Sequence, residues 1–469
     1  MARRLLLLAL GLLAALPATG RAQGRVCDLY SDPSTILSES PDGTQLIISG
    51  GNGPRFSCTG NVRISADSAV IIQATKEIFL HRSVRYADSV KTLTAEWLRY
   101  DGSVGLIHAE TNVVLTDRSG SVVRGQFLDY FQAGEGRPQP LAVIYGQPRP
   151  HAVLRRVGPP GGEPDTTPPL EVDADRMEVE GETRFRAIGG VRLLRGDLAG
   201  SAQEGSYDQA AGQMTLLRGA RLSSERFEIS GGRIDGFLEG EEVRFVHADS
   251  NAVLLSEELE VRAPTIRIGF QDGQVHDLVA RGKGRVGEGV GSDEALRARA
   301  NARNFRLVAD SIDALAPGQQ LEQVFAAGGA YAEQLADSAD PSVPGLISRD
   351  WLRGDSIRAF FAAAPPAPDA SADTVPPEER RVLERLVATG PEGNARAGYR
   401  MRDQQRQSQQ PGFSYVTADR IDIRFRDGQV EAMEADGAVR GIYLEPKAAA
   451  GAGNRAAANA AGPDRRPAS

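Results

Sequence analysis

The sequence is poor in lysine and lacks any basic cluster, and this shortage excludes a large class of functions. The 469 residues include 54 basic and 62 acidic side chains, which gives a formal net charge of -8. The lysines are Lys76, Lys91, Lys283 and Lys447, and the arginines are scattered among acidic residues. Because binding to a polyphosphate requires clustered positive charge, we expect no nucleic-acid partner.

The histidines are too few and too scattered to predict a metal or catalytic site. No two of the five share the spacing of metal ligands, and none forms a recognisable triad with serine and aspartate. Residues 282–287 fit the pattern G-x-G-x-x-G, but a dinucleotide site needs a following helix, and the surrounding residues predict strands. We therefore predict no catalytic residue, no metal and no cofactor, and expect that the protein is not an enzyme. The histidines are His81, His108, His151, His247 and His276.

Long apolar runs are confined to the beginning of the chain. Arg3 and Arg4 precede an apolar stretch over residues 5–16, which ends at Pro17, and Gly20-Arg21-Ala22 is a plausible cleavage site. This arrangement predicts a secretory signal peptide over residues 1–22. The alternative is an uncleaved membrane anchor, although the stretch is short for a span, which needs about 20 apolar residues.

Two cysteines, Cys27 and Cys58, follow the predicted signal peptide. In an oxidising compartment they can pair and close a loop of roughly thirty residues. Two unpaired thiols are the alternative. The sequence alone does not decide between a disulfide bond and free thiols, so both stay open at this point.

A repeat recurs along the second half of the chain. In the three clear copies, Ala is followed by Asp or Pro, apolar residues lie two and four positions after the Asp or Pro, and Gly lies eighteen positions after it. Clear copies begin at Ala263, Ala309 and Ala418, and a fourth begins at Gly354 and is split by an Ala/Pro-rich insertion. Weaker copies begin at Ala66, Ala95 and Ala174. The aspartates recur once per copy beside a turn, so we expect them to cap local backbone rather than form a site.

The spacing within a copy predicts two short antiparallel strands. Residues 420–426 alternate polar and apolar without a fault, which is the period of a strand with one buried face. Asp272-Gly273 and Asp427-Gly428 separate alternating runs and indicate hairpin turns. One strand pair alone is marginal in water, so successive pairs are expected to stack around a shared core. The sequence thus predicts an all-β, solenoid-like array of stacked strand pairs, with an ordinary β-sandwich as the alternative.

Composition divides the chain into segments of different character. Pro and Gly interrupt the patterned regions, and the Ala/Gly/Asn-rich end resembles disordered chain. Residues 294–304 have the composition of a short helix. The predicted segments are a first β portion over 44–131, a loop or linker over 132–169, a main array over 170–445 with an insertion at 362–377, and a disordered tail over 446–469. Inside the loop, residues 141–145 can form a strand of an interrupted unit.

The repeat resembles the OstA-like domain of periplasmic lipopolysaccharide-transport proteins. The resemblance rests on strands introduced by Ala-Asp, on turns such as Asp272-Gly273-Gln274, and on strand ends such as Gly60-Asn61-Val62 and Gly190-Val191, and it covers residues 45–445. It implies an open, twisted β-jellyroll that holds acyl chains against an apolar inner face. It also implies a periplasmic location, free or at the outer or inner membrane, and end-to-end strand pairing with other transport components or with a second copy.

The inward positions of the strands are the candidates for a lipid groove. An amphiphile such as lipopolysaccharide gains about 0.8 kcal/mol for each buried methylene, so it would travel against apolar side chains. Small residues at Ala280, Ala326, Ala388 and Ala435 would leave room for an acyl chain. One alternative is a structural or adhesive β-solenoid with a filled core, and another is a carbohydrate-active β-helix enzyme. The candidate lining residues are Ile266, Ile268, Leu278, Ile312, Val324, Ile357, Leu386, Ile421, Ile423 and Met433.

Overall fold

The computed structural model is built almost entirely of antiparallel strands, which belong to one large sheet. The predicted signal peptide over 1–22, the insertion beyond Ala363 and the tail over 446–469 lie outside the described residues. The chain divides into two compact units, residues 1–189 (unit 1) and 190–469 (unit 2). The structure describes residues 27–30, 34–134, 136–155, 168–239, 242–257, 259–282, 296–302, 305–334, 349–363, 381–401, 412–426 and 429–445.

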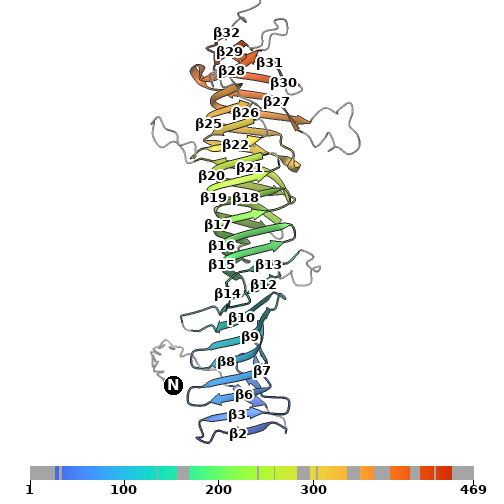
Figure 1. Cartoon of the computed structure of the whole chain (residues 1–469), viewed down its shortest axis with the longest axis vertical. Coiled ribbons are helices and arrows are strands. Elements are labelled where there is room, and N and C mark those ends of the chain that lie inside the picture. The colour runs from blue at the N-terminus through green and yellow to red at the C-terminus, as the bar shows by residue number, and fades with distance from the viewer. Residues whose placement is uncertain are drawn as a thin grey trace, which may run out of the picture. The chain divides into compact units, whose positions relative to one another are not determined.

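Unit 1 is a continuous succession of antiparallel strands, several of which lie side by side in chain order in Figure 1. Its strands are β1 (Cys27–Tyr30), β2 (Ile36–Glu39), β3 (Gln45–Ser49), β4 (Arg55–Cys58), β5 (Val62–Ser65), β6 (Ser68–Ile72), β7 (Glu77–Ala87), β8 (Lys91–Asp101), β9 (Leu106–Asp117), β10 (Val122–Phe131), β11 (Leu141–Tyr145), β12 (His151–Leu154), β13 (Leu170–Asp173), β14 (Arg176–Glu180) and the first part of β15 (Arg184–Arg195).

Unit 2 repeats the same arrangement (Figure 1). Its strands are β16 (Leu198–Asp208), β17 (Gln213–Ser223), β18 (Phe227–Glu239), β19 (Glu242–Ser256), β20 (Leu259–Gln271), β21 (Gln274–Arg281), β22 (Ala298–Ala302), β23 (Phe305–Ala309), β24 (Ser311–Leu315), β25 (Gln323–Gln334), β26 (Trp351–Ala363), β27 (Arg381–Thr389), β28 (Ala395–Met401), β29 (Gly412–Ala418), β30 (Arg420–Arg426), β31 (Gln429–Asp436) and β32 (Arg440–Leu444). Two short 3-10 turns, η2 (Pro317–Gln319) and η4 (Pro391–Gly393), join some of them.

Each long strand bends at a corner near its middle. In β7, Arg82 and Ser83 both have positive φ, and the strand's pairing with β8 shifts register between His81 and Val84. The short strands β5 and β6 pair with the two halves of β7 on either side of this corner. Two consecutive residues with positive φ are costly for most residue types. The same pair recurs at Thr111-Asn112 in β9, so the bend is a regular element of the fold.

The corners divide the strands of each unit into two half-sheets. In unit 1, half-sheet A contains β1, β4, β5, β12, β13 and the adjoining halves of the long strands, and half-sheet B contains β2, β3, β6, β11, β14 and the other halves. In unit 2, half-sheet A contains β22, β23, β28, β29 and β32, and half-sheet B contains β21, β24, β27, β30 and β31. The predicted all-β array of stacked antiparallel strand pairs is confirmed.

The eighteen-residue spacing between Asp and Gly is explained by the corners. The backbone N–H of Asp310, between β23 and β24, donates to the carbonyl oxygen of Gly328 at 3.2 Å. Gly328 has φ of +85°, and a Cβ built there would lie 2.4 Å from an Asp310 carboxylate oxygen. Asp419 and Gly437 repeat this contact at 2.3 Å. The glycine is therefore required both by its backbone conformation and by the aspartate packed against it.

The aspartates at the corners bind arginine side chains and distant backbone groups. Asp419 accepts a hydrogen bond at 2.6 Å from the backbone N–H of Gly393, which is 26 positions away and therefore not the local capping that was expected. Asp310 instead pairs with Arg297 at 3.1 Å, and the same guanidinium donates to the carbonyl oxygen of Gly328 at 2.6 Å. Arg149 binds Asp175 and the carbonyl oxygen of Gly189 in the same way, at 3.0 and 2.9 Å.

Two expectations about segments differ from the structure. Within the predicted loop over 132–169, the strand expected at residues 141–145 is present as β11, whereas β12 was not expected; the two strands pair with the two halves of β10 and extend the array. The division between the units falls at Gly189 and Gly190 rather than within this loop. The short helix expected over 294–304 is wrong, because residues 298–302 form β22, which pairs with both β20 and β23.

Candidate functional site

The ten candidate groove residues lie on half-sheet B of unit 2, in two adjacent rows that cross the strands. The first row is formed by cross-strand partners that alternate large and small. The second row is more uniformly large. The first row runs Ile266, Ala280, Ile312, Ala326, Ile357, Ala388, Ile421, Ala435, and the second Ile268, Leu278, Ala314, Val324, Ala359, Leu386, Ile423, Met433.

The rows are packed interior surface in this structure. Eight of the ten candidates are buried, while Val324 and Met433 are partly buried. Ala280, Ala326 and Ala388 have no exposed surface at all. The large neighbours on either side therefore cover the small residues, and solvent does not reach the space that was expected to admit an acyl chain.

Enlarging an alanine of the first row tests how full this interior is. We expect Ala326→Leu to lower the free energy of unfolding of unit 2 by about 1–3 kcal/mol, because extra methylenes in a packed core force strain. Ala327→Leu is the matched control, since Ala327 lies on the opposite face of β25. Trp351 lies in unit 2 and Trp97 in unit 1, so denaturant unfolding followed by tryptophan fluorescence in a Trp97→Phe background reports unit 2. Equal stability of the two variants would indicate an interior with unfilled space.

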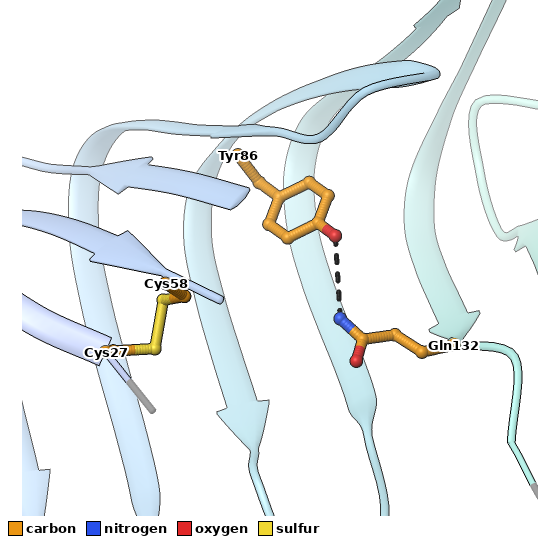
Figure 2. The surroundings of a disulfide bond; sticks show 4 residues. All are labelled: Cys27, Cys58, Tyr86 and Gln132. Carbon is orange, nitrogen blue, oxygen red and sulfur yellow. Dashed lines mark hydrogen bonds between the residues drawn. A yellow bond between two sulfur atoms is a disulfide. The ribbon is translucent and has the colours of Figure 1, made fainter. Parts of the chain in front are cut away.

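The rim of unit 1, where the strand ends farthest from the corners meet, is closed by polar contacts between the half-sheets. Gln132, after β10 in half-sheet B, donates its amide N–H to the hydroxyl of Tyr86 in half-sheet A at 3.5 Å. Figure 2 shows this hydrogen bond together with the Cys27–Cys58 disulfide bond. The Tyr130 hydroxyl donates to Asp88 at 3.4 Å, and the rings of Tyr86 and Tyr130 are 6.1 Å apart. These are long hydrogen bonds, so they hold the rim weakly.

Lys91 belongs to the same rim and was missed by the sequence analysis. It begins β8 on the inward face, is 3% exposed, and its Nζ has no hydrogen-bond partner among the described residues. Its ammonium lies 5.9 Å from the centre of the Tyr130 ring. Burial lowers the pKa of Lys91, and the carboxylates of Asp88, Asp117 and Glu182 oppose that shift. A rare lysine at an alternating inward position, two residues before Leu93, was the available signal.

The rim of unit 2 is also closed by side chains from both half-sheets. The guanidinium of Arg226, in the turn before β18, contacts the side-chain oxygen of Gln319 in η2. Beside it, the rings of Phe227 and Phe270 lie 6.2 Å apart.

Each unit has strands with one free edge. In the described pairings, β1 pairs with β4 alone, β2 with β3, β31 with β30, and β32 with β29. Unpaired backbone groups on such strands form a template for another strand. Large apolar side chains are exposed on or beside these edges, at Tyr30, Ile36, Leu37, Ile442, Tyr443 and Leu444.

Aromatic side chains cross the outer face of half-sheet B in unit 1, which the sequence analysis also missed. Ring centroids follow one another from Phe79 to Trp97 at 6.1 Å, from Trp97 to His108 at 5.9 Å and from His108 to Phe127 at 6.5 Å. The imidazole of His108 contacts Asp129 at 2.6 Å. Such cross-strand pairs stabilise a sheet. In the sequence, this row could have been found from the aromatic ring that stands at an outward position of each successive strand.

The structure brings no metal-binding cluster together in the parts of the chain that it describes. Within the same ranges, no helix has the length and apolar character needed to cross a membrane. No protein-family model matches the chain, and no curated protein matches it.

Proposed function

We propose that this chain is a periplasmic lipid-binding bridge protein, which carries lipopolysaccharide or a similar amphiphile toward the outer membrane along its apolar interior. The protein carries its lipid and does not convert it. The supporting observation is the pair of apolar rows that continues across successive strands of unit 2, from Ile266 to Ala435. A lining continuous across strands lets acyl chains move without entering water.

The closed rims define what lipid entry requires. Because the rows are buried, acyl chains reach them once the two half-sheets separate at the rim and the side chains repack. At the rim of unit 2 the contact of Arg226 with Gln319 and the ring pair of Phe227 and Phe270 must open for this entry. Burial of about 0.8 kcal/mol per methylene offsets the lost contacts once several methylenes enter. The strands themselves stay paired throughout.

The free edges supply the means of joining other proteins. Strand addition satisfies the backbone groups of an edge and specifies little about the partner, so other lipopolysaccharide-transport components or a second copy of the chain are the proposed occupants. The exposed apolar residues, such as Leu37 on β2 and Tyr443 on β32, would be covered by such pairing. End-to-end joining would extend the apolar lining beyond one chain.

Site-specific photocrosslinking in cells tests this proposal. A photoreactive residue at Ile421 or Ile312, both buried in the first row, should label lipopolysaccharide several times more strongly than one at Arg424. Arg424 is the matched control because it is exposed on the same strand as Ile421. The same residue at Leu37 or Tyr443 should label a protein partner. Lipid labelling at Ile421 no stronger than at Arg424 would refute lipid carriage.

A second candidate function is a structural or adhesive β-array with a filled core. The complete burial of Ala280, Ala326 and Ala388 favours it, since a groove that is always open would expose them. The two functions differ in lipid affinity. Protein stripped of lipid should bind a fluorescent acyl probe if it is a carrier, and should leave the probe free if it is a structural array.

A further inference from the structure

Lys91 is a buried cation at the boundary between the interior and the rim of unit 1. Along the inward face of β8, Lys91 is followed by Leu93 and Ala95, both buried. Its cross-strand partner at the rim end of β9 is Asp117. The ammonium therefore lies where an apolar lining gives way to polar side chains.

The acidic groups around Lys91 are already engaged with their own turns. Asp88 accepts hydrogen bonds from the backbone N–H of Val90 and of Lys91, each at 2.7 Å, and from the hydroxyl of Tyr86 at 3.1 Å. Asp117 accepts from the backbone N–H of Ser119 and of Ser121 at 2.8 and 2.9 Å. These carboxylates supply charge, but the Lys91 Nζ makes no hydrogen bond among the described residues.

A buried ammonium without an acceptor is costly, because its three donors lose water and gain no hydrogen bond in return. Replacing such a group by an apolar one of similar size is often neutral or stabilising. The position is thus poorly suited to stability alone. It is well suited to a ligand that brings an oxygen atom to the ammonium.

The charges around the ammonium decide which oxygen fits. The carboxylates of Asp88, Asp117 and Glu182 all favour the charged form of Lys91, so the ammonium already has compensating negative charge. A phosphate or carboxylate would be repelled by this arrangement, whereas a neutral carbonyl oxygen would not. In an acylated amphiphile, neutral carbonyl oxygens occur at the ester or amide links between the acyl chains and the headgroup.

We propose that Lys91 binds the ester or amide carbonyl oxygen of an acylated amphiphile whose chains enter between the half-sheets of unit 1. This assignment rests on the proposed lipid-carrying function and specifies how the lipid is positioned. The carbonyl takes the place of the Tyr130 ring beside the ammonium, after the long hydrogen bonds of Gln132 to Tyr86 and of Tyr130 to Asp88 have opened. The acyl chain then lies along Leu93 and Ala95.

Native mass spectrometry of the full chain with two matched probes tests the assignment. One probe is a monoacylglycerol, and the other is the alkyl glycerol ether of the same length, which lacks the carbonyl. The wild type should bind the ester about tenfold more tightly, as expected for one hydrogen bond from a charged donor. Lys91→Met should bind both equally while unfolding at the same or a higher denaturant concentration. Thr94→Val, an exposed change on β8, should keep the ester preference.

The outcomes separate this assignment from the function on which it rests. A wild type that binds no acyl probe overturns lipid carriage, and the assignment with it. A wild type that binds both probes, with the same ester preference in Lys91→Met, overturns the assignment alone. A third probe, lysophosphatidate, tests the charge argument. If the wild type binds it more tightly than the monoacylglycerol, and Lys91→Met removes that difference, the position is an anion site and the carbonyl assignment is wrong.

Discussion

Replacing Gly328 by alanine should lower the free energy of unfolding of unit 2 by about 3 kcal/mol or more. The backbone at Gly328 has φ of +85°, a conformation that costs an L-residue roughly 1–2 kcal/mol. The added Cβ would also meet an Asp310 carboxylate oxygen at 2.4 Å, so the aspartate must move. Moving it disturbs the pairing with Arg297, which also binds the carbonyl oxygens of Gly328 and Gly329.

Gly273→Ala is the control that separates the two costs. Gly273, in the turn between β20 and β21, has φ of +72°, but a Cβ added there would meet no other atom within 4 Å. Gly273→Ala should therefore lower the free energy of unfolding by the backbone cost alone, about 1–2 kcal/mol. Both variants can be unfolded in denaturant in a Trp97→Phe background, with Trp351 reporting unit 2. If the two substitutions cost the same, the packing of Asp310 against Gly328 contributes nothing to the corner.

Replacing both Cys27 and Cys58 by serine should lower the free energy of unfolding of unit 1 by about 3–4 kcal/mol. The two residues are cross-strand partners on β1 and β4, and they are joined by a disulfide bond across 31 positions of sequence. Closing a loop of this size restricts the unfolded chain by roughly that amount. The effect is also local, because β1 is an edge strand whose described pairing is with β4 alone.

Unfolding of the serine variant is followed through Trp97 in a Trp351→Phe background, which reports unit 1. The oxidised protein with both cysteines should be the more stable. Addition of a reductant should bring it to the stability of the double-serine variant, while the variant itself should not respond. A reduced protein as stable as the oxidised one would show that the disulfide bond does not hold the edge strand.

The inward-facing apolar residues could be predicted from sequence because alternation within one strand specifies which side chains share a face. Residues 420–426 alternate without a fault, and the predicted inward residues Ile421 and Ile423 lie in the two rows that strand pairing forms. The repeat also matched a structural unit, since its eighteen-residue interval runs from the corner at Asp310 to the corner at Gly328. What the sequence could not supply was the reason for the interval, because the contact between Asp310 and Gly328 exists only after the strands pair.

Other features depend on residues that sequence spacing does not connect. Residues 298–302 have the alanine and arginine content of a helix, but pairing with β20 and β23 outweighs that weak preference. The rim contact between Tyr86 and Gln132 joins residues 46 positions apart, which follows from how the half-sheets meet. Lys91 was overlooked for the same reason. Its importance lies in what surrounds it rather than in a motif.

The alternation of isoleucine and alanine along the first row constrains how such a protein can change length. Loss of β25 and β26 together would bring Ile312 next to Ala388, so large would still meet small and the remaining strands of both half-sheets would keep their antiparallel direction. Loss of a single strand would place two residues of similar size side by side. It would also make the two strands on either side of the gap run parallel. Insertions and deletions compatible with this fold therefore come in twos.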